Sequence, residues 1–138
     1  MTLWFDLDGT LADTLARWWE LDDEQWIERV RTAKGMINLA TFARLARKAQ
    51  AKGYKLGICS WLTKTNDKRI ADAKKEWLKK RLPSIEWDNI DIIANKEPKW
   101  LNRDGILFDD NKKNRADWEE HNGTAYNYDE ILTVLKAI

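Results

Sequence analysis

Short apolar runs and longer amphipathic stretches alternate along the chain. The apolar runs are typical of buried strands and lie at 3–5, 54–60, 90–94, 105–110 and 124–126. The amphipathic stretches repeat their apolar positions at helical spacing and lie at 11–31 with a break at 21–23, then at 39–52, 67–82, 98–102, 114–121 and 129–135. Strands that alternate with helices predict an α/β fold with a largely parallel sheet and helices on both faces.

Residue types that favour helix ends support some of these boundaries. Gly53 follows the second helical stretch and is typical of a C-terminal cap. Asp129 is placed to cap the last helix, and Asp13 is placed to cap a helix that begins near Thr14. We therefore expect two short helices in the region between the first strand and the helix at 39–52.

The composition narrows the class of protein. The chain has 138 residues, 43% of them hydrophobic and 34% charged, which predicts one globular domain over 1–138. The formal net charge of +1 provides no global field toward nucleic acid or a membrane, so any such contact needs a local patch. The apolar runs are shorter than the roughly 20 residues of a spanning helix, and no signal peptide is recognisable. We expect a cytoplasmic protein with no membrane contact.

The scarcest residues exclude several kinds of chemistry. Cys59 is the only cysteine and His121 the only histidine, so the chain forms no internal disulfide and has no Cys/His zinc cluster. A serine or cysteine nucleophile with a histidine base would have to use His121, which lies in a polar, turn-like stretch. Catalysis, if present, is expected to rest on other groups.

Carboxylates follow two of the predicted strands. Asp6 and Asp8 come at the end of the first strand, and Asp109 and Asp110 end the fourth. The carboxyl ends of parallel strands meet at one edge of a sheet, where these groups would repel one another unless a cation lies among them. A set of oxygen ligands without imidazole or thiolate favours Mg²⁺. The alternative interpretation is that each pair only starts a turn or caps a helix.

The carboxylates belong to a larger pattern. The segment Asp6-Leu7-Asp8-Gly9-Thr10-Leu11-Ala12-Asp13 resembles the first motif of the haloacid dehalogenase (HAD) superfamily of phosphohydrolases. Ile58-Cys59-Ser60 resembles the second motif, Lys96 lies where the third-motif lysine is expected, and Ile106 to Asp110 with Asn114 resembles the fourth. The resemblance implies a Rossmann-like three-layer fold with strand order 5-4-1-2-3 and a small helical insert at 14–36 in place of a cap.

The resemblance also implies roles for single residues. Asp6 would be the nucleophile that forms an aspartyl-phosphate, and Asp8 the acid and base. Mg²⁺ would be held by Asp6, the backbone carbonyl of Asp8 and Asp110, and Asp109 would act through water or behind these ligands.

Further residues would bind phosphate or orient the site. Ser60 and Lys96 would hold the phosphoryl group, and Lys96 is preferred over Lys99. Thr10 would bind phosphate or orient the acid/base residue. Asn114 would orient the lysine or the metal waters, or would simply start a solvated helix. The resemblance thus predicts a magnesium-dependent phosphatase.

The size of the insert bears on the substrate. Capless HAD members often act on large substrates such as nucleic-acid ends or phosphoproteins, and short-capped relatives include deoxyribonucleotidases. We expect a phosphorylated substrate, with a nucleotide or a nucleic-acid phosphate end favoured, a phosphoprotein as a further possibility, and no obligate protein partner. Trp18, Trp19 and Trp26 in the insert, and Trp61 after Ser60, are candidates for contact with a base, with packing as the alternative.

Two further features bear on the surface and on the alternative function. The basic stretch at 74–81, with Lys74, Lys75, Lys79, Lys80 and Arg81, predicts a solvated helix face. The alternative function is a catalytically idle HAD-like module that binds a phosphate or a partner. The presence of both Asp6 and Asp8 disfavours that alternative, because idle members usually lose one of them.

Overall fold

The computed structural model describes all 138 residues and contains one parallel sheet. Its strands are β1 (Thr2–Phe5), β2 (Lys55–Trp61), β3 (Asn89–Ile93), β4 (Ile106–Phe108) and β5 (Thr124–Tyr126). They are ordered β3-β2-β1-β4-β5, and each neighbouring pair is parallel. This is the predicted order 5-4-1-2-3 read from the other edge, so the α/β fold class and the strand order are confirmed.

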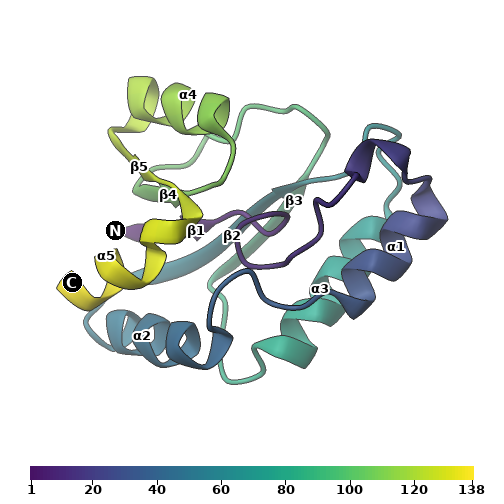
Figure 1. Cartoon of the computed structure of the whole chain (residues 1–138). Coiled ribbons are helices and arrows are strands. Elements are labelled where there is room, and N and C mark those ends of the chain that lie inside the picture. The colour runs from purple at the N-terminus through teal and green to yellow at the C-terminus, as the bar shows by residue number, and fades with distance from the viewer.

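Helices cover both faces of the sheet (Figure 1). They are α1 (Asp23–Thr32), α2 (Leu39–Ala51), α3 (Arg69–Arg81), α4 (Lys112–Asn122) and α5 (Ile131–Ala137), with short 3-10 turns η1 (Trp18–Glu20) and η2 (Tyr128–Glu130). Helix α4 lies on one face and the other four helices lie on the opposite face. None of these helices combines the length and the apolar character that crossing a membrane requires.

The core follows from the alternation of side chains along β1. Leu3 and Phe5 point into the larger core under α2 and α3, whereas Trp4 points to the α4 face. Phe5 stacks on Phe108 of β4 with ring centroids 4.8 Å apart and meets Phe42 of α2 edge to face at 5.0 Å. Burial of the central strand on both faces fixes where its carboxyl end, and the residues after it, must lie.

The insert after β1 forms two short helical segments that are interrupted at Leu21 and Asp22, as expected, but the first of them begins later than expected. No helix begins near Thr14, and Asp13 is exposed and caps nothing. Arg17 has a left-handed backbone (φ 51°), which stops a continuous helix, and only η1 and α1 form. Asp22 is the N-cap of α1 and makes a reciprocal capping box with Gln25.

Two other local expectations are corrected. The stretch at 98–102 forms turns instead of a short helix, and it ends at Asn102 with φ 59°. The last helical region begins with a capping box made by Asn127, so Asp129 is not the cap. By contrast, Gly53 follows α2 with φ +103° and its N–H donates to the carbonyl of Gln50, as expected of a helix C-terminus.

Both termini lie at the amino ends of the strands (Figure 1). The carbonyl of Met1 accepts a hydrogen bond from the N–H of Lys55 at 3.0 Å, at the start of β2. Lys52 Nζ donates to the carbonyl of Ile138 at 2.7 Å. The carboxyl ends of β1, β2 and β4, which carry the predicted site residues, face the other way.

Candidate active site

A tight loop holds the first pair of aspartates where β1 ends. The N–H groups of Thr10, Leu11 and Ala12 donate to the carbonyl of Leu7, which bends the chain directly after Asp6. Gly9 has φ +73°, and a Cβ there would collide with Leu15 and lie 2.7 Å from Asp110 Oδ2. The bend lets Asp6 and Asp8 face the same region, although they are two residues apart on the chain.

The second pair lies at the end of β4 and is held by several donors. Asp109 is fully buried, and its Oδ2 accepts from Lys99 Nζ at 2.8 Å and from Asn114 Nδ2 at 3.2 Å. Its Oδ1 accepts from the N–H of Asn111 at 2.9 Å. Asn114 therefore lies against the site and orients Asp109, which places it near the position that the sequence suggested.

Asp110 is tied to the first loop through Thr10. The Thr10 hydroxyl donates to Asp110 Oδ1 at 3.1 Å and accepts from the N–H of Asp110 at 3.1 Å. Thr10 is fully buried. Both of its hydrogen-bonding capacities face Asp110, so it joins the two halves of the site.

Three carboxylates form a cluster that fits a metal ion. Asp6, Asp109 and Asp110 each offer one oxygen, and these oxygens lie within 4.8 Å of one another. Burial and the Asp109 carboxylate raise the pKa of Asp6 well above its ordinary value, although Lys99 opposes the shift. Burial and Asp109 also raise the pKa of Asp110. Repulsion of this kind, among hard oxygen donors, is what a divalent cation relieves. Asp109 thus belongs to the acidic cluster, while both of its oxygens accept hydrogen bonds from the protein.

Lys99, and not Lys96, approaches the carboxylates. Lys99 is nearly fully buried, and its Nζ lies 3.0 Å from Asp6 Oδ1 and 2.8 Å from Asp109 Oδ2. Burial by itself lowers the pKa of Lys99, but Asp109 and Asp6 outweigh it, so the net pKa is raised and the group stays charged. Lys96 is exposed, on a turn where its own φ is 65°. The turn directs the Lys96 side chain to solvent, so Lys99 is the one of these two lysines that lies beside the carboxylates.

Ser60 and Asp8 share a second buried lysine. Lys74 of α3 is 1% exposed, and its Nζ donates to Asp8 Oδ2 at 2.8 Å, to Ser60 Oγ at 2.7 Å and to the carbonyl of Trp61 at 2.6 Å. The other oxygen of Asp8 accepts from the hydroxyl of Thr14 at 2.8 Å. Asp8 therefore pairs with Lys74, whereas Asp6 and Asp109 pair with Lys99.

Sequence reasoning missed Lys74 because it lies in a run of basic residues. Lys75, Lys79 and Lys80 of that run are exposed, as a solvated face predicts, but Lys74 is not. The signal was in the spacing, because the buried residues of α3 are Ile70, Ala73, Lys74, Trp77 and Leu78. A lysine in register with an apolar stripe indicates a buried, paired charge.

The tryptophans divide between the core and the surface. Trp18 and Trp19 in η1 are 49% and 66% exposed, and η1 lies beyond the carboxyl end of β2 (Figure 1). Trp61 is half-buried, with Lys99 Nζ 5.5 Å from its ring and its Nε1 donating to the carbonyl of Glu97. Trp26 packs against the core. Trp18 and Trp19 therefore form an exposed aromatic surface near the carboxyl ends of the strands.

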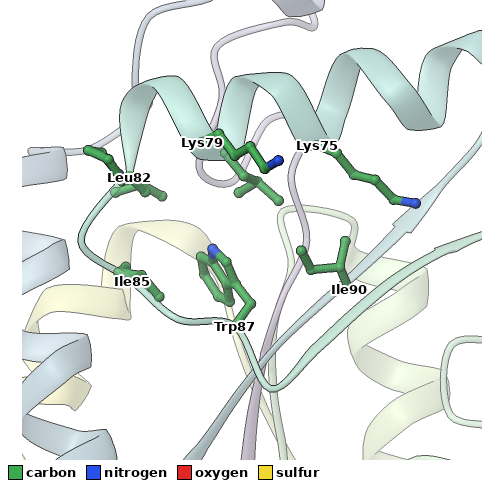
Figure 2. A pocket seen from close by; sticks show the side chains of 8 residues that line it. Lys75, Lys79, Leu82, Ile85, Trp87 and Ile90 are labelled. Atoms are coloured by element: carbon green, nitrogen blue, oxygen red, sulfur yellow. The ribbon is translucent and has the colours of Figure 1, made fainter.

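A groove on the other side of α3 is separate from this site. It has a volume of about 380 Å³ and is lined by Lys75, Leu78, Lys79, Leu82, Pro83, Ile85, Trp87 and Ile90. Figure 2 shows Lys75 and Lys79 extending from the helix above Trp87 and Ile90. None of the predicted site residues lines it. Cys59 is also outside the site, because it packs with Trp4, and burial raises its pKa to about 11.

Comparisons with known proteins place the fold. The chain is similar to a D,D-heptose 1,7-bisphosphate phosphatase from Burkholderia thailandensis, with TM-score 0.63 and 8% identity, over 99% of this chain and 96% of that one. It is also similar to a chain of the Pnkp1/Rnl/Hen1 RNA repair complex, with TM-score 0.64 and 17% identity over 92% of this chain, and to one in a second structure of that complex, with TM-score 0.60 and 18% identity. The chain therefore has the fold of these proteins, with a parallel five-stranded sheet between layers of helices, as the alternation of strands and helices indicated.

The likeness is one of structure and not of sequence. No family model matches the chain, and no curated protein matches it. The chain spans 42% and 45% of the two chains from the RNA repair complex, so it corresponds to part of each of them. The comparisons therefore show the fold of the chain, and its activity, metal and substrate are matters for proposal.

Proposed function

We propose that the protein is a Mg²⁺-dependent phosphomonoesterase that works through an aspartyl-phosphate on Asp6. One observation carries this proposal: Asp6 lies at the end of the central strand with Lys99 Nζ 3.0 Å away and the oxygens of Asp109 and Asp110 within 4.8 Å. A nucleophilic carboxylate, a buried cation and a metal-binding acidic cluster are the groups that phosphoryl transfer requires.

The free oxygens support a particular ligand set. Both oxygens of Asp109 already accept from protein donors, whereas no lysine, amide, backbone N–H or hydroxyl donates to Asp6 Oδ2 or Asp110 Oδ2. We therefore assign the metal to Asp6 and Asp110, with the backbone carbonyl of Asp8 as a further ligand. Mg²⁺ bound there would neutralise charge on the transferring group and offset the repulsion among the carboxylates.

The aspartates divide the reaction into two steps. In the first, a carboxylate oxygen of Asp6 bonds to phosphorus, the bond from phosphorus to the leaving oxygen breaks, and Asp8 gives that oxygen its proton. In the second, a water oxygen attacks the same phosphorus, Asp8 takes the water's proton, and the bond to Asp6 breaks. Inorganic phosphate leaves, and both aspartates return to their starting states.

The remaining groups orient and neutralise. Lys99 takes the role first assigned to Lys96, because its ammonium lies beside the oxygen of the nucleophile. Ser60 accepts from Lys74, so its hydroxyl hydrogen is free to donate to a phosphoryl oxygen. Thr10 orients Asp110, and Asn114 orients Asp109.

The surroundings of the site favour a nucleotide or a nucleic-acid phosphate end as substrate. The insert contributes only η1 and α1, and α1 packs alongside α3, so no full cap encloses a small molecule. Exposed Trp18 and Trp19 provide aromatic faces on which a base can stack. The similarity to chains of an RNA repair complex supports the same choice.

A phosphate panel tests the proposal. The full chain is assayed with Mg²⁺ on p-nitrophenyl phosphate, mononucleotides, phosphopeptides and oligonucleotides phosphorylated at the 3′ or 5′ end. Hydrolysis should stop with a chelator and in Asp6→Asn, and should persist in Asp129→Asn, which removes an exposed carboxylate outside the site. Equal activity in Asp6→Asn refutes the mechanism. No hydrolysis of any substrate favours an idle module that binds a phosphate or a partner.

A further inference from the structure

Lys74 occupies a position that would ordinarily hold an apolar side chain. It faces the core from the stripe of α3 that also contains Ile70, Trp77 and Leu78, and it is 1% exposed. Burying an ammonium costs several kcal/mol unless its hydrogens are all bonded, and an apolar residue of the same size would serve packing at least as well. The residue type is therefore not explained by the stability of the helix.

The three partners of Lys74 indicate what the charge does. All three N–H groups of its Nζ are used, on Asp8 Oδ2, Ser60 Oγ and the carbonyl of Trp61. None of them is a member of the acidic cluster, whose cation is Lys99. The two buried lysines thus serve different halves of the site.

Asp8 is held by two donors on opposite oxygens. Thr14 Oγ1 donates to Oδ1 at 2.8 Å, and Lys74 Nζ donates to Oδ2 at 2.8 Å. With both bonds made, the carboxylate has one orientation; with either bond removed, it turns about its own side-chain torsions. A group that transfers protons must lie within hydrogen-bond reach of the atom it serves, so this orientation matters for both steps.

We propose that Lys74 is a positioning residue that acts through Asp8 and is dedicated to proton transfer. The inference rests on the proposed function and adds a residue outside the motifs that suggested it. Lys74 takes no part in the attack of Asp6 on phosphorus, which Lys99 and the metal ligands assist. Lys74 also donates a hydrogen bond to Ser60 Oγ, so the hydroxyl hydrogen of Ser60 points away from Lys74.

The proposal predicts a kinetic signature that depends on the leaving group. The p-nitrophenolate ion departs without a proton, so formation of the aspartyl-phosphate from p-nitrophenyl phosphate needs little from Asp8. Hydrolysis of that intermediate still needs Asp8 to take a proton from water. The alcohol of glycerol 2-phosphate leaves poorly unless it is protonated, so that substrate needs Asp8 in both steps.

Pre-steady-state kinetics of Lys74→Met are the test. With p-nitrophenyl phosphate we expect a burst of about one p-nitrophenolate per enzyme molecule, with a burst rate within about threefold of that of the parent protein. Steady turnover should then be about 100-fold slower than in the parent, which is the lower end of the usual contribution of acid–base catalysis. With glycerol 2-phosphate the first turnover itself should slow by about 100-fold. Because kcat/KM depends only on binding and the first step, KM for p-nitrophenyl phosphate should fall about as much as kcat does, whereas KM for glycerol 2-phosphate should change little.

Two variants keep this test independent of folding. Thr14→Val removes the other donor to Asp8 without touching Ser60, and it should show the same burst followed by slow turnover. Lys79→Met removes an exposed lysine of the same helix and should match the parent.

The outcomes separate the inference from the proposed function. A burst slowed as much as the steady state, or a tenfold rise in KM, means that Lys74 contacts the phosphoryl group and overturns the positioning role. Parent-like turnover in Lys74→Met also overturns it and leaves the proposed function intact. A parent chain with no activity refutes both.

Discussion

Asp110→Asn tests whether the acidic cluster is built for a cation. The oxygens of Asp6, Asp109 and Asp110 lie within 4.8 Å of one another, and at that separation two unit charges repel by about 3.5 kcal/mol at an effective dielectric constant near 20. Asp6 and Asp109 share Lys99, whereas Asp110 forms no ion pair. The charge of Asp110 is thus the least compensated. Proton uptake by the cluster relieves part of the repulsion in the parent protein. We therefore expect the free energy of unfolding of the variant to exceed that of the parent by about 1–3 kcal/mol in the absence of metal.

The gain should depend on pH with a definite sign. The pKa of Asp110 is raised in the folded protein above its ordinary value of 3.8. A group of this kind contributes stability that is fully present below pH 3.8 and is lost as pH rises through the folded pKa. An asparagine cannot ionise, so Asp110→Asn escapes this loss. Its advantage over the parent chain should be near zero in acid and largest at pH 8.

Thermal unfolding in chelator and in Mg²⁺ measures both effects. A gain of 1–3 kcal/mol corresponds to about 3–9 °C in Tm for a chain of this size. Mg²⁺ at about one hundred times its Kd should add about 2.7 kcal/mol to the parent and much less to the variant. Glu119→Gln, on an exposed face of α4, should show the parent response to metal. An Asp110→Asn protein that is less stable than the parent at pH 8 in chelator, or that keeps the full response to Mg²⁺, contradicts the reasoning.

Three other predictions concern the scaffold. Gly9→Ala should abolish activity and lower the free energy of unfolding in urea by about 1–3 kcal/mol, because φ is +73° and the Cβ collides with Leu15. Gly53→Ala, where φ is +103° and the Cβ meets open space, should lose less stability and keep its activity. Equal losses in the two variants would contradict the steric argument. Cys59 is buried and its pKa is raised to about 11, so a thiol reagent at pH 7 should label it only in denaturant. Trp77→Ala removes a buried ring and its hydrogen bond to a carbonyl, and denaturant titration should show a loss of about 3–5 kcal/mol; a loss below 1 kcal/mol would refute its place in the core.

The sequence predicted the sheet because all five strands read as short apolar runs, and the three central strands, β1, β2 and β4, are buried on both faces. It predicted helices less well where single residues decide the backbone. Arg17 and Asn102 both have positive φ, and neither apolar spacing nor composition indicates this. The side chain of Thr14 donates to Asp8, so a residue expected to begin a helix serves the site instead.

The aspartates could be found from the sequence, but their supporting lysines could not. The positions of the aspartates follow from strand ends, which the apolar runs mark. A lysine reaches its partner through a long, flexible side chain. The local backbone conformation sets the direction of that side chain and so decides which partner it contacts. Lys96 and Lys99 are three residues apart, yet only Lys99 is directed at Asp6. Lys74 was hidden by its charged neighbours, although its register on α3 matched the apolar stripe.

The positions of the chain ends decide how the protein can be attached to something else. Met1 and Ile138 are both bonded near the start of β2, at the end of the sheet opposite the carboxylates. A tag, a surface tether or a fused fluorescent protein at either end would therefore point away from the strand ends. The candidate site of an immobilised protein should therefore be as accessible as in solution, which makes single-molecule binding experiments practical with either end anchored.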